Sequence, residues 1–404
     1  MTADADRIVV VGAGLVGLAI AQRLVLSGRE VVVVDKEERV AAHQSGHNSG
    51  VVHSGIYYTP GSLKARLCRR GVALLREYCA EHRLEYREIG KVIVAKDASE
   101  LGRLADLEER ARANGVPGVR RLGPAGLRDL EPNVVGVAAL HSPSTAIVDY
   151  SAVARSLAAT VVDHGGQVRL GEEVRAITAR GQGATVTTSR GVVEAGQVVI
   201  CAGLQSDVLA RVAGDGEAPA IVPFRGEYLR LVPDRAHLVR GLVYPVPDPA
   251  YPFLGVHFTP RIDGSVDIGP NAVLATAREG YRRRDFDAGH LWQVVRWPGA
   301  RALFRQHWRT GVHELHGSLS KRAYVKGARA YVPSLRRTDV VRAGAGVRAQ
   351  AVDRDGGLVD DFRISTLGPV TAVRNAPSPA ATSALAIAEH VVGLVAAARS
   401  RRTP

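Results

Sequence analysis

A glycine-rich turn between two apolar runs constrains the fold of this chain more than any other feature. Residues 7–11 are apolar and β-branched and predict a buried strand, and Gly12-Ala13-Gly14-Leu15-Val16-Gly17 follows directly. An apolar helix is expected over 18–26, and a second buried strand over 30–34 ends at Asp35. Such a turn lets the backbone approach a pyrophosphate while the acidic residue accepts from a ribose hydroxyl. The spacing predicts a dinucleotide site with Gly12, Gly14, Gly17 and Asp35 as ligands.

The rest of the chain predicts a mixed α/β protein. Its 404 residues are 46% hydrophobic and 23% charged, a balance typical of globular proteins and long enough for two or three domains. From 219 to 270 the pattern becomes rich in short strands, proline and aromatic residues, which favours a separate antiparallel sheet. Three cysteines exclude a disulfide framework, and no Cys/His spacing predicts a metal site.

The positive charge is concentrated in one stretch. The net charge is +13, and residues 281–342 hold 14 Lys and Arg against 4 Asp and Glu. This stretch is either a solvated arginine-rich face or a patch that attracts anionic lipid or acidic substrates. No nucleic-acid motif accompanies it, so we expect no nucleic-acid partner.

The acidic N-terminus resembles no secretory signal, and no apolar run reaches the ~18 residues of a membrane span. We expect a cytoplasmic protein, with peripheral contact on an anionic inner membrane as an option.

A small, polar loop follows the second strand. His43-Gln44-Ser45-Gly46-His47-Asn48-Ser49-Gly50 leads into His53, Tyr57 and Tyr58. The fold returns this loop to the cofactor, where it can donate hydrogen bonds to a pyrophosphate and a flavin ring. Histidine and tyrosine directly after it predict a substrate wall, although a histidine such as His53 is, on its own, more often a satisfied core residue.

The run from His43 to Arg66 resembles the L-2-hydroxyglutarate oxidase/dehydrogenase family, which lies within the D-amino-acid oxidase superfamily of flavoproteins. The resemblance continues in the same order along the chain. The segments that carry it are Pro223–Tyr228, Tyr244–Pro249, Pro252–His257, Asp263–Ser265, Gly269–Leu274, Gly346–Ala351 and Asn375–Ala384. It implies a discontinuous, Rossmann-like FAD-binding domain over 1–90, 141–215 and 335–404. It also implies an α+β substrate domain over 91–140 and 216–334, built on an antiparallel sheet.

The resemblance also implies FAD rather than NAD as the cofactor. One departure is Asp35, where such flavoproteins usually carry Glu, one methylene longer. Free N–H groups at the start of the last helix are expected to meet the flavin carbonyl. The remaining predicted cofactor contacts are Gln44, Ser45, His47, Asn48, Ser49, Gly50, Val174, Ala202, Gly203, Arg348, Pro379, Ala380, Ala381 and Thr382.

The implied reaction oxidises L-2-hydroxyglutarate to 2-oxoglutarate by hydride transfer to flavin N5, with electrons passed to a quinone or to oxygen. A neutral imidazole suits the base that takes the hydroxyl proton. We favour His257 as this base and expect His53 to polarise or position the substrate. The two roles are open to reversal. A diacid needs cations, for which Arg225 and Arg348 are the first candidates, although Arg225 is equally explained by an ion pair with Glu227 or Asp248. Second candidates are Tyr57, Tyr58, Tyr244 and Lys64.

Other interpretations stay open at this point. One alternative is a flavoprotein of the same fold that acts on another 2-hydroxy or amino acid and differs only in its substrate pocket. A protein that binds NAD without chemistry, or a lipid-surface protein that uses the basic stretch 281–342, belongs to another class.

Overall fold

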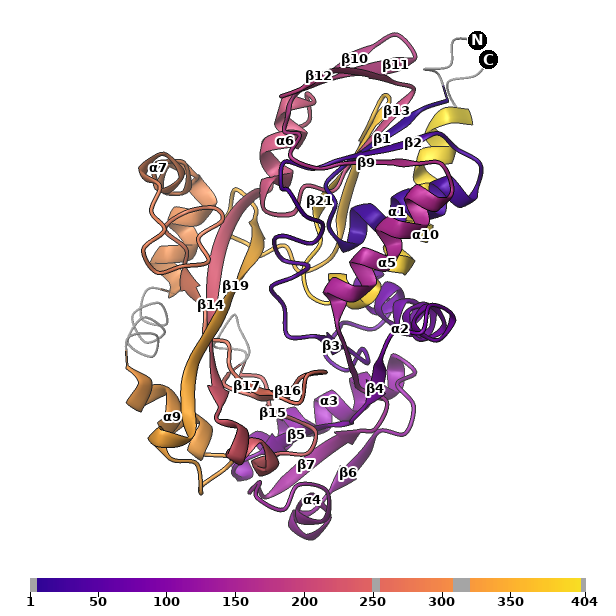
Figure 1. The fold of residues 1–404 in the computed structure, drawn as a ribbon. Helices are drawn as coiled ribbons and strands as arrows, with labels where there is room; N and C mark the ends of the chain where they lie inside the picture. The colour runs from indigo at the N-terminus through magenta and orange to yellow at the C-terminus, as the bar shows by residue number, and fades with distance from the viewer. Residues whose placement is uncertain (1–5, 249–254, 308–319, 401–404) are drawn as a thin grey trace.

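The computed structural model describes residues 6–248, 255–307 and 320–400. Within them, six strands form a sheet in the order β20-β21-β13-β1-β2-β9, parallel except for β20 at one edge (Figure 1). Its strands are β1 (Ile8–Val11), β2 (Val31–Val34), β9 (Gln167–Arg169), β13 (Gln197–Ile200), β20 (Arg363–Leu367) and β21 (Val370–Asn375).

Both faces of this sheet are covered. Ile8 and Val10 point into a core shared with α1 (Leu15–Leu26), α2 (Leu63–Glu81), α5 (Tyr150–Asp163) and α10 (Ala380–Ser400). Val9 and Val11 point to the other face, against α6 (Ser206–Val212) and a small sheet of β10 (Val174–Arg180), β11 (Gly183–Thr188) and β12 (Gly191–Ala195). Burial on both faces explains why these strands are continuous apolar runs rather than alternating ones.

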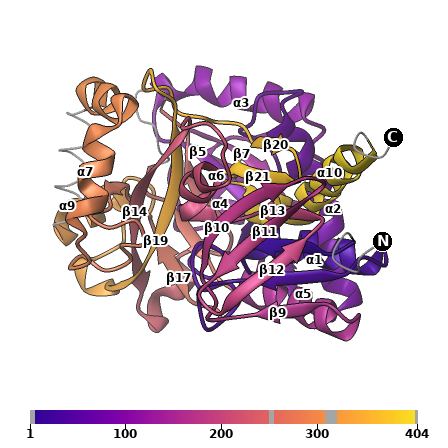
Figure 2. The same ribbon diagram turned by 90° about the horizontal axis from the view of Figure 1, so that it is seen from above.

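The second large sheet contains nine strands of the described chain, in the order β18-β14-β17-β16-β15-β5-β7-β6 with β19 on β14. It is antiparallel except where β15 runs parallel to β5. Figures 1 and 2 show β14 and β19 as two long strands side by side, with α7 (Ala288–Arg296) on one side of them. The strands are β5 (Lys91–Ala95), β6 (Arg120–Leu122), β7 (Ala138–Ser142), β14 (Ala220–Leu231), β15 (Leu242–Pro245), β16 (Phe258–Pro260), β17 (Val266–Ile268), β18 (Val273–Leu274) and β19 (Val340–Val352).

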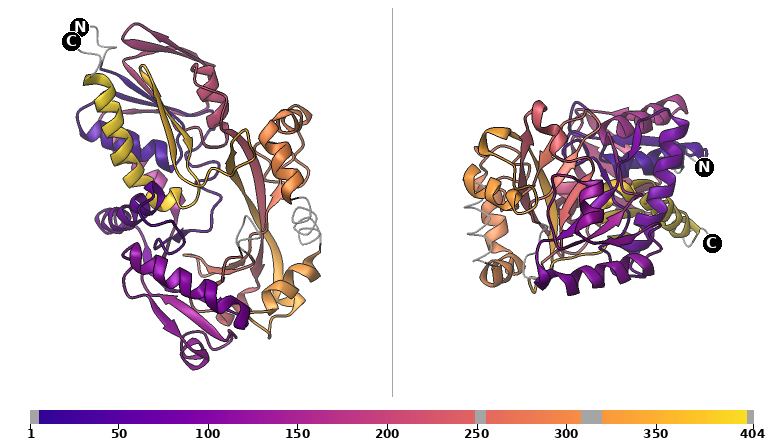
Figure 3. Two further views of the ribbon diagram at one scale, coloured as in Figure 1. Left: turned by 180° about the vertical axis from the view of Figure 1, so that it is seen from behind. Right: turned by 90° about the horizontal axis from the view of Figure 1, so that it is seen from below.

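A third, small sheet connects the two parts of the molecule. In it β8 (Ala146–Val148) pairs with β3 (Val51–Val52) and with β4 (Tyr86–Glu88). The remaining helices are α3 (Leu101–Ala113), α4 (Pro124–Leu130), a helix over 298–307 and α9 (Lys321–Arg329). Viewed from behind, α3 and α4 lie at the end of the molecule opposite β10, β11 and β12 (Figure 3).

The predicted α/β class with a parallel and an antiparallel sheet is confirmed. One strand lies in a different sheet from the one expected. β19 follows the predicted boundary at residue 335, and yet it pairs with β14 along almost its whole length. The pairing partners are more than a hundred residues apart, which sequence pattern alone does not reveal.

The last helix, α10, is long and apolar, as the sequence predicts. By length and composition α10 is able to cross a membrane, and it is the one such helix in the described part of the chain. Its apolar residues, including Ile387, Val391 and Val395, belong to the core shared with α1 and α2. This packing is that of a core helix.

Candidate active site

The glycine-rich turn lies where β1, β13 and β2 end. Gly12 has a φ of +110°, and a Cβ placed on it would lie 2.4 Å from the carbonyl oxygen of Cys201. A Cβ on Gly17 would lie 2.0 Å from the Gly12 carbonyl oxygen. Both glycines are therefore required by close backbone approach. Gly14 is the N-cap of α1 and supplies no capping side chain, which leaves N–H groups of the first turn for an anion.

Asp35 has a structural role in this turn. Its carboxylate accepts hydrogen bonds from the backbone N–H of Ala13, at 2.6 Å, and from that of Glu37, at 2.9 Å. These bonds hold the turn against the end of β2. The predicted ribose contact would use the carboxylate's other lone pairs and stays a prediction.

The polar loop after β2 packs on the same turn. The Ser45 hydroxyl accepts from the N–H of Leu15 at 2.9 Å, and the Gln44 side chain lies against Gly203, which follows β13 with Ala202. Asn48 folds the loop by donating to the Gln44 and Ser45 carbonyls and accepting from Gly50 N–H. The loop thus brings Ser45 to the α1 N-terminus and Gln44 to Gly203, and the cofactor contacts of Asn48, Ser49 and Gly50 stay predictions.

Three further predicted cofactor residues join this region. Val174 begins β10 and packs with Val34 at the end of β2. The His47 ring lies 4.3 Å from the Tyr281 ring, and its backbone carbonyl closely approaches Gly346 of β19. At the start of α10, after Pro379, Ala380 and Ala381, the Thr382 hydroxyl accepts from the His53 N–H at 3.1 Å.

The residues present fit a dinucleotide. The turn has no room for side chains at Gly12 and Gly17, and the N-cap Gly14 has no side chain to bond the first-turn N–H groups, of which Ser45 takes that of Leu15. Uncapped N–H groups beside a loop of hydroxyl and amide side chains are what a pyrophosphate requires.

A largely buried cluster of histidines, tyrosines and cations lies next to this cradle. Its members are His53, Tyr57, Lys91, Tyr244, His257 and Arg348. His257 precedes β16, and its ring stacks on Tyr244 of β15 with centroids 4.0 Å apart. The Nδ1 of His257 lies 2.8 Å from the Gly255 carbonyl, so Nδ1 carries the proton. The other nitrogen, Nε2, is left as an acceptor without a partner among the described residues. Burial lowers the pKa of His257 to about 3, so the imidazole is neutral at physiological pH.

His53 follows β3 on the opposite side of this cluster. Its side chain is partly buried, and its buried Nδ1 has no hydrogen-bond partner among the described residues. Burial first, and then the charges of Lys91, His257 and Lys64, hold the pKa of His53 well below its usual value. Tyr57 also belongs to the cluster, and its hydroxyl has no hydrogen-bond partner in the part of the chain that the structure describes.

Lys91 is a member that the sequence analysis missed. It begins β5, is 2% exposed and lies among the largest fully buried side chains. Its Nζ is 4.3 Å from the Tyr244 ring centroid and 5.1 Å from that of Tyr57. Burial lowers the pKa of Lys91 to about 7. The sequence does contain a signal for this residue, because Lys91 begins an apolar strand run, GKVIVA. Lysine is almost never fully buried without a partner, so a lysine in such a run indicates a functional role.

The predicted substrate-binding cations separate in the structure. The charge of Arg348, on β19, acts on both His257 and Tyr244. Arg225 pairs with Glu227 at 3.4 Å and donates to the Arg282 carbonyl at 3.2 Å. The structure therefore brings Arg348 to the cluster, whereas Arg225 is engaged by Glu227 and the Arg282 carbonyl.

Tyr58 and Lys64 lie at the side of the cluster near α2. Lys64 pairs with Asp360 at 2.7 Å, and its Nζ lies 5.1 Å from the Tyr58 ring centroid. Both side chains are buried. Their contact with a substrate stays a prediction.

Comparison with known families decides what this cradle holds. Residues 7–394 match the family described as FAD dependent oxidoreductase. The chain belongs to this FAD-dependent oxidoreductase family. FAD is therefore the dinucleotide for which the cradle is built.

Named relatives within this family are similar over nearly the whole chain. The human "L-2-hydroxyglutarate dehydrogenase, mitochondrial" is 45% identical, with 94% of this chain and 86% of that protein covered. The "L-2-hydroxyglutarate dehydrogenase" of Indibacter alkaliphilus is 43% identical, covering 94% and 96%. That of Salmonella houtenae is 43% identical, covering 98% and 94%.

Solved structures share the family fold at lower identity. L-alpha-glycerophosphate oxidase from Mycoplasma pneumoniae, solved with FAD bound, superposes with a TM-score of 0.78 at 23% identity, covering 96% of this chain and 94% of that one. Glycine oxidase from Geobacillus kaustophilus gives 0.72 at 20% identity, covering 97% and 95%.

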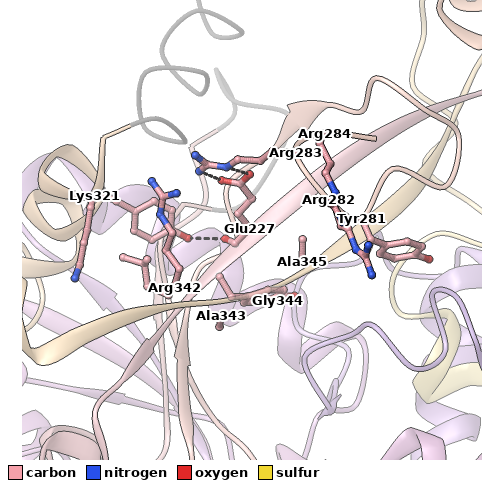
Figure 4. A pocket seen from close by; sticks show the side chains of 13 residues that line it. Glu227, Tyr281, Arg282, Arg283, Arg284, Lys321, Arg342, Ala343, Gly344 and Ala345 are labelled. Carbon is pink, nitrogen blue, oxygen red and sulfur yellow. Dashed lines mark hydrogen bonds and ion pairs between the residues drawn. The ribbon is translucent and has the colours of Figure 1, made fainter. Parts of the chain in front are cut away.

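The basic stretch of this flavoprotein lines a cavity of about 470 Å³ over β14 and β19 (Figure 4). Arg283 makes a bidentate ion pair with Glu227 there, which the dashed lines in Figure 4 mark. Arg282, Arg284 and Arg342 also line it and make no ion pair with a described residue.

A second charged cluster joins the loop after β2 to the segment before α7. Glu37, His43 and Glu279 have side-chain atoms close enough to bind one metal ion. The Lys36 ammonium already lies 2.7 Å from both carboxylates, so the cluster is an ion-pair network. The absence of a metal from the enzyme stays a prediction.

Proposed function

We propose that this flavoprotein oxidises L-2-hydroxyglutarate to 2-oxoglutarate. One observation carries the proposal: two uncharged imidazoles, the buried His257 and the partly buried His53, face a site that also holds Arg348. An uncharged base and a cation are what the oxidation of a hydroxy acid requires. Relatives that are 43–46% identical over about 95% of the chain carry the name of this activity.

The chain's own groups position the substrate and take its proton. The unpartnered Nε2 of His257 accepts the hydroxyl proton while the Gly255 carbonyl fixes the ring through Nδ1. Arg348 binds a substrate carboxylate, and His53 holds the substrate from the other side. Burial of the cluster excludes water from the reacting carbon. Bound FAD supplies the two-electron acceptor.

The first experiment is an anaerobic titration of the purified yellow protein. L-2-Hydroxyglutarate is expected to bleach the flavin absorbance band, and the D form is expected to leave it unchanged. A flavin that stays oxidised with the L form would contradict the substrate. The alternative, another 2-hydroxy or amino acid, is supported by the fold shared with glycine oxidase and L-amino acid deaminase structures. A panel of such acids in the same cuvette tests it.

The electron acceptor is proposed to be a quinone or oxygen. Reoxidation of the reduced enzyme by dissolved oxygen, followed by stopped flow, is compared with reoxidation by a soluble quinone analogue. A faster reaction with quinone identifies a dehydrogenase, and a faster reaction with oxygen identifies an oxidase.

The location is proposed to be the cytoplasm, with peripheral contact on anionic lipid. Arg282, Arg284 and Arg342 support it, because each unpaired basic residue near an anionic surface contributes about 1 kcal/mol. Changing all three residues to Gln is expected to weaken binding to phosphatidylserine vesicles at low salt by roughly 100-fold, as measured by co-sedimentation. The matched control changes the exposed Arg121, Arg128 and Arg180 to Gln. Equal loss in both triple variants, or no binding of the wild type, would contradict the contact.

The domain division is proposed in amended form. The FAD-binding part comprises 1–90, 141–215 and 353–404, and the substrate part comprises 91–140 and 216–352, because β19 belongs to the substrate sheet. The sheet membership of the strands supports it. Limited proteolysis is expected to cut first between these parts.

A further inference from the structure

Lys91 is a buried cation without an anion. It is 2% exposed, and no Asp or Glu among the described residues forms an ion pair with it. Its backbone is fixed on both sides, by Leu242 of β15 and Ser142 of β7. A charge placed so deep without a counter-ion is costly and is seldom kept for stability.

The surroundings of Lys91 hold its ammonium at the active cluster. The Tyr57 and Tyr244 rings lie on it at centroid distances of 5.1 and 4.3 Å, and its charge acts on both His53 and His257. Cation–π contacts of this kind hold an ammonium without neutralising it. The charge is therefore left for something that enters the site.

The contact of Arg225 with Glu227 agrees with the ion-pair interpretation of this arginine rather than with carboxylate binding. Its guanidinium is engaged by Glu227 and the Arg282 carbonyl. Arg348 supplies one cation at the cluster, and a dicarboxylate needs a second. The Lys91 ammonium lies against Tyr244, whose ring stacks on His257, and against Tyr57.

We propose that the Lys91 ammonium binds one carboxylate of a dicarboxylate substrate, with Arg348 opposite it, an assignment that rests on the proposed oxidation of L-2-hydroxyglutarate. The arriving carboxylate is the missing counter-ion. The preference of the enzyme for a diacid over a hydroxy acid with a single carboxylate then depends on Lys91.

Substrate binding is consequently coupled to proton uptake. Burial lowers the pKa of Lys91 to about 7 in the free protein, and a bound carboxylate raises it again. Above pH 7 the free enzyme has lost this proton and must regain it on binding. The dissociation constant of a diacid should therefore rise with pH, by up to about tenfold per unit.

The test uses the FAD-loaded enzyme and glutarate, a diacid that has no hydroxyl to oxidise. Flavin absorbance changes measure its dissociation constant from pH 6.5 to 9. Calorimetry in buffers of different ionisation enthalpy measures protons taken up by the wild type at pH 8. We expect close to one proton per glutarate. No proton uptake, or no glutarate binding at all, would overturn the proposal without any variant being made.

Lys91→Met and Lys96→Met form the matched pair of variants. Lys96 lies just beyond the other end of β5 and is half-exposed. Lys91→Met is expected to raise the glutarate dissociation constant about 30-fold or more at pH 6.5 and to abolish its pH dependence, while Lys96→Met changes neither. Glutarate binding that is equally tight in Lys91→Met would contradict the assignment. A wild type that binds glutarate through Lys91 but is not reduced by L-2-hydroxyglutarate would instead contradict the proposed function alone.

Discussion

At the scale of single residues, the site is defined by polar groups that burial leaves without partners. His53 Nδ1 and the Tyr57 hydroxyl are buried without a hydrogen-bond partner in the described chain, and the buried Lys91 has no ion-pair partner there. Most buried polar groups in folded proteins are paired, so such a concentration in one place indicates a ligand site. By contrast, the buried Arg374 makes four hydrogen bonds or ion pairs to residues 215–219 and is structural.

His257→Asn tests the assignment of the base. Loss of a general base is expected to slow flavin reduction by about 10²–10⁴-fold, with little change in glutarate affinity. Single-turnover stopped flow measures the step. The control is His164→Asn, which changes an exposed histidine at the end of α5. If His53→Asn slows reduction and His257→Asn does not, the two roles are reversed.

At the scale of elements, turns and helix ends position the cofactor cradle and couple it to the cluster. The Gly12–Gly17 turn brings the α1 N-terminus to the ends of β1 and β13. The Thr382 hydroxyl at the start of α10 accepts from the N–H of His53 and also contacts the Tyr150 hydroxyl at 3.1 Å. One side chain thus ties the last helix to the strand that carries a proposed catalytic residue.

Gly12→Ala tests the turn. Its added methyl would meet the Cys201 carbonyl, and its φ of +110° is unfavourable for alanine. We expect a lower melting temperature and loss of bound FAD, measured as the ratio of flavin to protein absorbance. The matched control is Gly102→Ala in α3, where nothing lies within 4 Å of the added carbon. That change should stabilise the protein by up to about 1 kcal/mol. Full FAD content in Gly12→Ala would contradict the close approach.

Thr382→Val tests the link between α10 and His53. Removing the hydroxyl leaves a buried N–H without its acceptor, which costs about 1–3 kcal/mol of unfolding free energy. Urea denaturation measures this, with Thr366→Val, at a more exposed hydroxyl of β20, as the control. Equal stability in the two variants would show that the bond contributes nothing.

At the scale of the whole molecule, burial of titratable groups between the two sheets makes stability depend on pH. Burial holds the pKa of His257 at about 3 and that of His53 well below its usual value, whereas both histidines titrate near 6.5 when unfolded. Below pH 6.5 the unfolded chain therefore binds more protons than the folded one. Lys91, with a pKa of about 7 when folded and 10.5 when unfolded, has the same effect between those values.

The free energy of unfolding is accordingly expected to fall as pH drops from 6.5 towards 3, by about 1.4 kcal/mol per pH unit for His257, and His53 contributes in the same direction. Between pH 7 and 10.5 the buried Lys91 should make stability rise with pH. Urea unfolding at intervals of one pH unit measures both slopes. Lys91→Met should flatten the alkaline slope alone, and an unchanged alkaline slope in that variant would contradict the burial of a charged lysine.

The sequence by itself determined the cofactor half of the protein. β1, the turn and α1 are local in the chain, and an apolar run, three glycines and Asp35 specify them through backbone sterics and periodicity. The resemblance of His43–Arg66 pointed to a flavoprotein, and membership of the FAD-dependent oxidoreductase family confirms it. Tyr244 and His257, both proposed from family segments, stack on each other in the structure, and their contact with a substrate stays a prediction.

Only the tertiary structure decided which cations meet the site. Arg225 and Arg348 both lie in family segments, but β14 pairs with β19 so that Phe224 faces Arg348, and alternation along the strand turns Arg225 the other way. Lys91 looks like an ordinary strand residue until β5 is seen between β15 and β7, with Tyr57 and Tyr244 against its ammonium. Desolvation and pairing depend on neighbours brought together by long-range strand register, and no local pattern contains that information.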